Sequence, residues 1–332
     1  MVTIKDIAKL ANVSTATVSY VLNNTRPVHP DKEKKVREAI KELNYVPNSA
    51  ARGLRSKKNQ TIGLVITDIT NPFYPNLAKG CQEVLKQNDY TLMMYNSDEQ
   101  HDQISNVVRH VREGKLDGII LANLVTTDID NLKALNELNF PTVIVHRNLK
   151  NINMDSVVVD NYSGAHAGTE HLIGLGHKNI IFFQGINESP VTIERKNGYI
   201  DAMKTNGLEP CIKEGKGSYQ ASYSQTLKLI NDESQKNPTA IFASSDIMAF
   251  GVMDAVKTQG LSVPEDISVI GYDDLFMSSW NSIQLTTVRV PTFELGKQAA
   301  RLLLRKMNND SEKKNHLVLQ TELIIRKTCN PL

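Results

Sequence analysis

The chain has 332 residues, of which 40% are hydrophobic and 22% charged, and its formal net charge is +2. This length suffices for a small domain followed by one or two larger units. No run approaches the ~18 apolar residues that a membrane span needs, and no apolar signal region opens the sequence. Cys81, Cys211 and Cys329 are far apart and include no CxxC pair. We therefore expect a cytoplasmic protein with reduced thiols, without a disulfide, a metal site or a cofactor.

Positive charge is concentrated at one end of the sequence. Residues 1–60 hold 12 Lys and Arg against 5 Asp and Glu, a balance of +7, whereas the remaining residues hold 26 against 31, a balance of −5. A compact basic module on a mildly acidic body indicates binding to a phosphate backbone through that module. A uniformly solvated charged surface would not confine the charge in this way.

The first 44 residues have the pattern of three short helices. Apolar residues at helical spacing predict a first helix over 4–11 and a third over about 30–44. Between them, Asn12 can adopt the left-handed backbone that ends a helix, and Ser14 can cap a second helix that presents small and polar side chains. Two helices joined by a tight turn form the helix-turn-helix that docks in the major groove of DNA.

Residues 45–60 read as a linker with two alternative states. The segment from Ser49 to Arg55 is long enough for about two helical turns, but helices this short are marginal in water, and Gly53 weakens it further. We expect a disordered tether in the free protein and a hinge helix when the segment meets its dimer mate and DNA.

From residue 62 onward, short apolar runs alternate with helical segments. Strands are expected at 62–67, 91–97, 117–123, 142–146, 156–161, 179–185, 240–245 and 268–274, with helices near 74–88, 101–113, 128–139, 163–175, 192–206, 220–233, 246–259 and 292–307, and a last strand within 317–328. This alternation predicts parallel sheets covered by helices on both faces, in two doubly wound lobes. No G-x-G-x-x-G or Walker sequence follows a strand, which disfavours a nucleotide-dependent enzyme. No heptad repeat follows the last strand, so we expect a homodimer and no coiled-coil tetramer.

Four motifs together resemble the LacI/GalR family of bacterial transcriptional repressors. They are TIKDIAKLANVSTATVSYVLNN, LNYVPNSAARGLRS, IGLVITDITNPFY and VIGYDD, in family order. The pattern is most similar to members that resemble ribose-operon repressors. The resemblance implies an all-α headpiece with a hinge helix over 1–58, followed by a two-lobed α/β core like that of periplasmic binding proteins. The expected lobes are 60–160 plus 289–320 and 161–288 plus 321–332, so the chain passes between them three times.

The resemblance also assigns residues that contact DNA. The family's recognition helix meets base edges at the positions of Thr15, Ala16, Thr17 and Tyr20, and Tyr20 stands where members differ in operator preference. Arg26 is expected on a base or a phosphate, Leu54 in the minor groove as an apolar wedge, and Arg55 on the DNA backbone.

The expected effector site lies at the carboxyl ends of the strands, between the lobes. Its aromatic side chains can stack on a sugar ring, and its charged and polar side chains can bind hydroxyl groups. The members are Asn71, Phe73, Tyr74, His146, Arg147, Ser189, Arg195, Tyr219, Ser245 and Asp273. Ribose-responsive relatives usually have Asp at the position of His146 and Asn at that of Ser245, so the hydrogen-bond pattern differs here. His146 is either an imidazolium that pairs with an anion or a neutral hydrogen-bonding residue.

These features predict a homodimeric DNA-binding repressor controlled by a small-molecule effector, a sugar such as ribose or a sugar phosphate. The alternative is a global regulator of the catabolite-control type that answers to a phosphorylated carrier protein. A periplasmic-type sugar-binding protein is disfavoured by the basic headpiece. An enzyme is disfavoured because Ser244-Ser245-Asp246 lies in no G-x-S-x-G sequence and no H-E-x-x-H is present.

Overall fold

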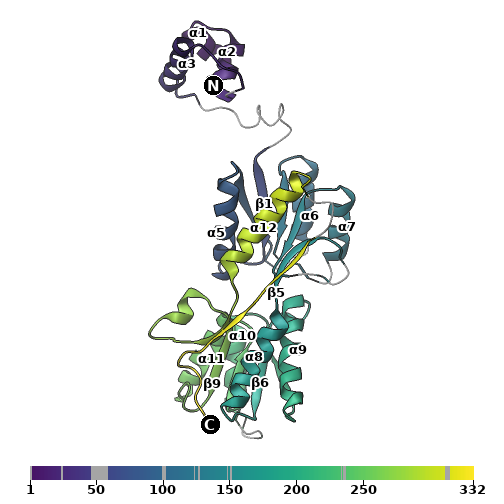
Figure 1. Ribbon diagram of the computed structural model, residues 1–332. Coiled ribbons are helices and arrows are strands. Elements are labelled where there is room, and N and C mark those ends of the chain that lie inside the picture. Colours follow the sequence, from purple (N-terminus) through teal and green to yellow (C-terminus); the bar gives the residue numbers. More distant parts are fainter. Residues whose placement is uncertain are drawn as a thin grey trace. The chain divides into compact units, whose positions relative to one another are not determined.

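The chain forms two compact units, Met1–Asn59 and Gln60–Leu332 (Figure 1). The computed structural model describes residues 2–23, 25–45, 59–98, 102–122, 124–125, 128–147, 149, 152–232, 234, 237–310 and 315–332. Within these ranges, no helix combines the length and apolar character that crossing a membrane requires. The expected hinge helix falls on residues outside the described ranges.

The first unit is a three-helix bundle made of α1 (Ile4–Leu10), α2 (Thr15–Asn23) and α3 (Pro30–Glu42). Asn12 has φ 53°, which confirms the left-handed residue that ends the first helix. Ser14 Oγ accepts a hydrogen bond from the Thr17 amide at 3.1 Å, as expected of a cap. Ile7, Val18 and Val36 are fully buried, one from each helix, so a single small core holds the bundle together.

The second unit contains two six-stranded sheets. The first has the order β11-β5-β4-β3-β1-β2 and is parallel throughout. Its strands are β1 (Thr61–Ile66), β2 (Thr91–Asn96), β3 (Gly118–Leu121), β4 (Thr142–Val145), β5 (Asp155–Val159) and β11 (His316–Leu319). Buried side chains on one face meet α5 (Phe73–Lys86) and α12 (Thr292–Met307), and those on the other meet α6 (Asp102–Arg112) and α7 (Ile129–Glu137).

The second sheet has the order β12-β10-β9-β8-β6-β7, and only β12 runs antiparallel to its neighbour. Its strands are β6 (Ile180–Gln184), β7 (Cys211–Glu214), β8 (Ala240–Ala243), β9 (Ser268–Asp273), β10 (Thr286–Arg289) and β12 (Glu322–Ile324). Its helices pack in two pairs, α8 (Asn161–Gly174) with α9 (Pro190–Thr205), and α10 (Tyr219–Ile230) with α11 (Asp246–Thr258). A 3-10 turn, η2 (Phe276–Ser279), follows β9.

The chain passes between the sheets at three places. It leaves the first sheet after β5, returns after β10 and leaves again after β11 (Figure 1). Two of these crossings are tied together, since Thr321 Oγ1 donates to the Asp160 carbonyl oxygen at 3.3 Å. The expected final strand over 317–328 is in fact two strands, because residues 320–321 carry the chain from one sheet to the other.

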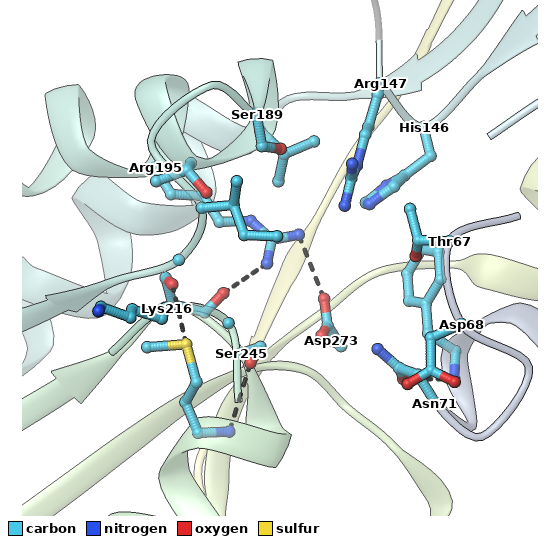
Figure 2. Close-up of a pocket in the computed structure, with 18 of the residues that line it drawn as sticks. Thr67, Asp68, Asn71, His146, Arg147, Ser189, Arg195, Lys216, Ser245 and Asp273 are labelled. Carbon is cyan, nitrogen blue, oxygen red and sulfur yellow. Dashed lines mark hydrogen bonds and ion pairs between the residues drawn. The ribbon is translucent and has the colours of Figure 1, made fainter. Parts of the chain in front are cut away.

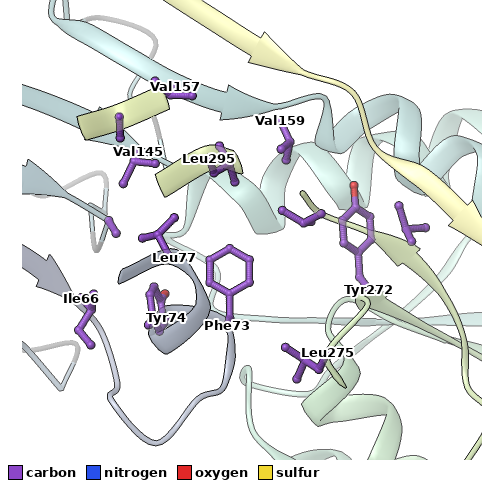
Figure 3. Packing of buried hydrophobic residues seen from close by; sticks show 14 of the residues in the cluster. Ile66, Phe73, Tyr74, Leu77, Val145, Val157, Val159, Tyr272, Leu275 and Leu295 are labelled. Carbon is purple, nitrogen blue, oxygen red and sulfur yellow. The ribbon is translucent and has the colours of Figure 1, made fainter. Parts of the chain in front are cut away.

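One apolar cluster runs continuously from the first sheet to the second. Figure 3 shows Leu77 and Leu295 packed near Val145, with Phe73 between this group and Tyr272 of the second sheet. The contact of α5 with α12 is close, because a Cβ at Gly80 would lie 2.0 Å from the Phe293 carbonyl oxygen. This buried bridge leaves the carboxyl ends of the strands from both sheets facing a shared space.

Candidate functional site

A cavity of about 250 Å³ lies where the strands of the two sheets end. We call it the central cavity, and Figure 2 shows its wall. Its lining combines the segments after β1, β4, β6, β7, β8 and β9, namely Thr67, Asp68, Asn71, Phe73, Tyr74, His146, Arg147, Gly185, Ile186, Ser189, Val191, Thr192, Arg195, Lys216, Gly217, Ser244, Ser245, Met248 and Asp273. The volume is near the lower end of the roughly 300–1,000 Å³ of small-molecule sites, which suits a small ligand.

Arg195, on the second turn of α9, makes the most contacts in this wall. Its Nε donates to Asn161 Oδ1 at 2.9 Å and its Nη1 to the Ser244 carbonyl oxygen at 2.6 Å. Its guanidinium also covers the Tyr272 ring at 3.6 Å. Nη2 lies 3.2 Å from Asp273 Oδ1 in an ion pair, but it makes no aligned hydrogen bond to a described residue. The guanidinium is therefore rigidly placed, and its Nη2 amino group is left to donate to a ligand.

Two buried carboxyl groups lie behind this guanidinium. Burial raises the pKa of Asp273 to about 6, although the Arg195 charge opposes the shift. Burial and the charge of Asp273 raise the pKa of Asp246 to about 7. Asp246 accepts hydrogen bonds from the Leu275 amide at 2.7 Å and from Ser278 Oγ at 2.6 Å. Asp246 thereby fixes the turn that follows β9, whereas Asp273 faces the cavity.

His146 ends β4 with φ 68° and is buried, and its ring centroid lies 4.4 Å from that of Phe73. Burial, together with the charges of Arg195 and Arg147, holds its pKa well below 6.5. Its Nδ1 is buried and has no hydrogen-bond partner among the described residues. Burial therefore favours the neutral ring in the ligand-free protein, and the role of His146 toward an effector stays a prediction.

The other predicted residues of the cavity come from helix starts. Phe73 and Tyr74 begin α5 and meet edge to face at 5.3 Å, and Asn71 Oδ1 accepts from the Phe73 amide at 3.0 Å. Ser189 and Ser245 precede α9 and α11 directly. Their roles in binding an effector stay predictions.

Tyr219 requires a correction, because it does not line the central cavity. It begins α10, and its hydroxyl donates to Asp254 Oδ2 at 2.6 Å while its ring stacks on Tyr223. This short hydrogen bond directs the Tyr219 side chain toward α11. Tyr219, Tyr223 and Asp254 border a separate hollow on the surface.

Ten lining residues are not among the expected effector residues, namely Thr67, Asp68, Gly185, Ile186, Val191, Thr192, Lys216, Gly217, Ser244 and Met248. Lys216 and Gly217 follow β7, whose sequence CIKE has no apolar run to reveal a strand. Thr67 and Gly185 end the predicted strands 62–67 and 179–185, but in the structure they are the first residues after β1 and β6, so each predicted strand ends one residue too late.

The expected DNA-reading residues gather on one surface of the first unit. Thr15, Ala16 and Arg26 are exposed and Tyr20 is half-buried, with the Arg26 guanidinium 5.3 Å from the Tyr20 ring centroid. Thr17 is half-buried, and its hydroxyl lies 2.9 Å from Ser14 Oγ. Leu54 and Arg55 lie outside the described residues. Within the described parts of the chain, no three His, Cys, Asp or Glu side chains are grouped as a metal ion would require.

A helix-turn-helix unit followed by a two-sheet core with a buried polar cavity defines the class of ligand-responsive DNA-binding regulators. Sequence profiles agree with this class: that of bacterial regulatory proteins of the lacI family matches residues 3–48, and that of a periplasmic binding protein-like domain matches residues 169–329. The chain belongs to the LacI family of transcriptional regulators.

Among its relatives, Catabolite control protein A of Priestia megaterium is 36% identical over 93% of this chain and 94% of its own length. The HTH-type transcriptional repressor PurR of Aliivibrio fischeri is 35% identical over 99% of each chain. The Lac repressor dimer bound to operator and the anti-inducer ONPF superposes with a TM-score of 0.89, at 28% identity and 99% coverage of both chains. A LacI family transcriptional regulator from Enterococcus faecium with bound ribose superposes with a TM-score of 0.74, at 28% identity, and the match covers 82% of this chain and 99% of that one.

Proposed function

We propose that this chain is a homodimeric repressor whose affinity for a pseudo-palindromic operator is switched by a small polyhydroxylated effector in the central cavity. The effector is a sugar such as ribose, or a sugar phosphate. The observation that carries the proposal is the free Arg195 Nη2 donor beside the Asp273 carboxylate, both buried in the cavity wall. A sugar hydroxyl beside this pair accepts a hydrogen bond from Nη2 and donates one to the Asp273 carboxylate. The ribose-bound Enterococcus neighbour supports the same class of ligand.

The dimer and the operator follow from the structural neighbour on DNA. The Lac repressor of that complex is a dimer on its operator, and the present chain matches it over nearly its whole length. A two-fold protein requires two related half-sites, each read by one recognition helix. Here α2 presents Thr15, Ala16 and Tyr20 as the side chains that read bases, with Arg26 next to Tyr20.

We propose that effector binding in the central cavity is coupled to DNA binding by the headpiece. The coupling runs through the segments that pass between the two sheets. Arg195, which faces the ligand, holds Asn161 at the first crossing through Nε, and Tyr272 also donates to the Asn161 carbonyl oxygen at 3.3 Å. A ligand that changes the position of Arg195 therefore acts directly on a segment joining the two sheets. Such a ligand shifts the equilibrium between two arrangements if it prefers one of them.

The test has two stages on the full chain. Thermal shift against pentoses, hexoses and their phosphates identifies binders, since a ligand at 100 times its Kd stabilises the folded state by about 2.7 kcal/mol. Operator duplexes selected from a randomised pool then report affinity by fluorescence anisotropy, with and without the binder. A binder that requires Arg195 and leaves operator affinity unchanged refutes the proposal.

A second candidate is regulation by a phosphorylated carrier protein, favoured by the 36% identity to Catabolite control protein A. It predicts that the phosphorylated carrier, and not its unphosphorylated form, binds the full chain and raises operator affinity. A response to sugars alone, with no binding of either carrier form, decides against this alternative.

A further inference from the structure

The buried wall of the central cavity has more positive than negative groups. Arg147 and Arg195 are each at most 7% exposed, and Asp273 is the only carboxylate of comparable burial among the described residues that line the cavity. The half-buried Asp68 and the exposed Lys216 add one charge of each sign to the lining. The ligand-free cavity therefore carries a net positive charge with a neutral His146. Positive potential in a low-dielectric wall attracts an anion.

His146 and Arg195 each direct an unused polar atom to this region. Figure 2 shows the ends of His146 and Arg147 pointing into the cavity toward the guanidinium of Arg195. His146 Nδ1 and Arg195 Nη2 are both fully buried without a hydrogen-bond partner among the described residues. A ligand group that pairs with such atoms relieves an unfavourable burial and gains affinity. Nη2 can only donate, so its partner must be an acceptor.

We propose that the effector carries an oxyanion, a phosphate or a carboxylate, which binds between His146, Arg147 and Arg195. This inference rests on the proposed function, because it places the effector in the same cavity. The oxyanion accepts hydrogen bonds from the guanidinium groups and from the imidazole ring. Burial is the main cause that lowers the pKa of His146, and the charges of Arg195 and Arg147 add to it. The oxyanion offsets these two charges and stabilises the imidazolium, so the ring takes up one proton from solvent as the ligand binds.

The experiment compares matched ligands that differ only in the anionic group. Ribose, ribose 5-phosphate and ribonate, and the corresponding arabinose set, are titrated calorimetrically into the full chain at pH 7.5, in two buffers of different ionisation enthalpy. We expect a phosphorylated or carboxylated member to bind at least ~10-fold tighter than its neutral parent, with uptake of up to one proton. The comparison of phosphate with carboxylate members distinguishes the two sources of the oxyanion.

The result that overturns the inference is a neutral sugar that binds as tightly as its anionic partners, or an anion that binds without proton uptake. If that neutral sugar also changes operator affinity, the proposed function survives and only the oxyanion is lost. If no member of either set binds, and millimolar inorganic phosphate gives no thermal stabilisation, both the inference and the sugar effector fail.

A matched pair of variants locates the effect. His146→Asn keeps a neutral polar side chain and suits the positive φ, since Asn adopts left-handed backbone readily. It should lose at least ~10-fold in affinity for the anion and abolish proton uptake, and the loss in affinity for the neutral sugar should be smaller than that for the anion. Lys204→Gln removes an exposed charge from the last turn of α9, outside the cavity lining, and should change affinity less than threefold. Unfolding temperature checks that both variants are folded. Unchanged proton uptake in His146→Asn overturns the assignment.

Discussion

Replacing Arg195 with Met tests whether the cavity wall depends on a buried ion pair. The substitution leaves Asp273 as a buried carboxylate whose partner stood at 3.2 Å, and it removes the donors to Asn161 and Ser244. Removing one partner of a buried ion pair typically costs about 3–5 kcal/mol. We expect a loss of this size in the free energy of unfolding at pH 8.

The same variant should be much less destabilised at pH 5. Arg195 lowers the pKa of Asp273, which burial raises to about 6, so without the guanidinium this pKa rises further. An Asp whose pKa is higher in the folded protein than its unfolded value of about 3.8 binds more protons in the folded state. Its contribution to the free energy of unfolding therefore falls as the pH rises from about 3.8 to about 6. At pH 5 Asp273 is largely protonated in the wild type too, and removal of its partner costs less.

The assay is urea unfolding at both pH values, followed by the fluorescence of Trp280, the only tryptophan in the chain. Trp280 is 48% exposed and contacts Phe276 just after the turn that Asp246 fixes, so it reports on this part of the core. Arg289→Met is the control, since its guanidinium is 45% exposed in its ion pair with Asp274. It should cost at most ~1 kcal/mol. Equal losses in the two variants, or no pH dependence in Arg195→Met, would refute the reasoning.

Three other outcomes follow from the structure. Asp246→Asn should reduce the fall in the free energy of unfolding between pH 4 and 7. The pKa of Asp246 is about 7 in the folded protein against 3.8 in the unfolded chain, a difference that corresponds to roughly 4 kcal/mol over that range. Urea titrations at several pH values measure this dependence. Tyr219→Phe should leave effector affinity within twofold of wild type by calorimetry, whereas a tenfold loss would return Tyr219 to the site. Arg26→Ala should weaken operator binding. If Arg26 contacts a phosphate, the slope of log affinity against log salt should fall by about two, because the dimer brings two copies of Arg26 to the operator, and an unchanged slope with altered base preference would assign it to a base instead.

Local features of the fold could be predicted because their causes are local. The left-handed Asn12 and the capping Ser14 depend on a few neighbouring residues, and their geometry agrees with the prediction. The alternation of strands and helices is visible because parallel strands are apolar on both faces. β7 escaped prediction because it is an edge strand with a polar sequence, and the sequence 317–328 gave no sign that it changes sheets at residues 320–321.

The site was predicted less completely because its chemistry depends on distant partners. The neutral state of His146 is set partly by Arg195, which is remote in sequence and enters the same wall from α9. Tyr219 had the right residue type at a strand-to-helix junction, but Asp254 of α11 directs its hydroxyl elsewhere. Nine of the ten expected effector residues line the cavity, and the exception is the one whose orientation is fixed by a helix-to-helix hydrogen bond.

In the proposed function, Arg195 both binds the effector and transmits the response, which constrains the thermodynamics of the switch. Arg195 contacts Asp273 in the cavity and Asn161 in a segment that joins the two sheets. A ligand that binds Nη2 therefore also acts on that segment. If effector binding changes operator affinity by some factor, operator binding must change effector affinity by the same factor. Asn161→Ala cuts this connection without entering the cavity lining, and it should reduce both factors together. A change in one factor alone would mean that a further linked equilibrium, such as dimer dissociation, contributes to the response.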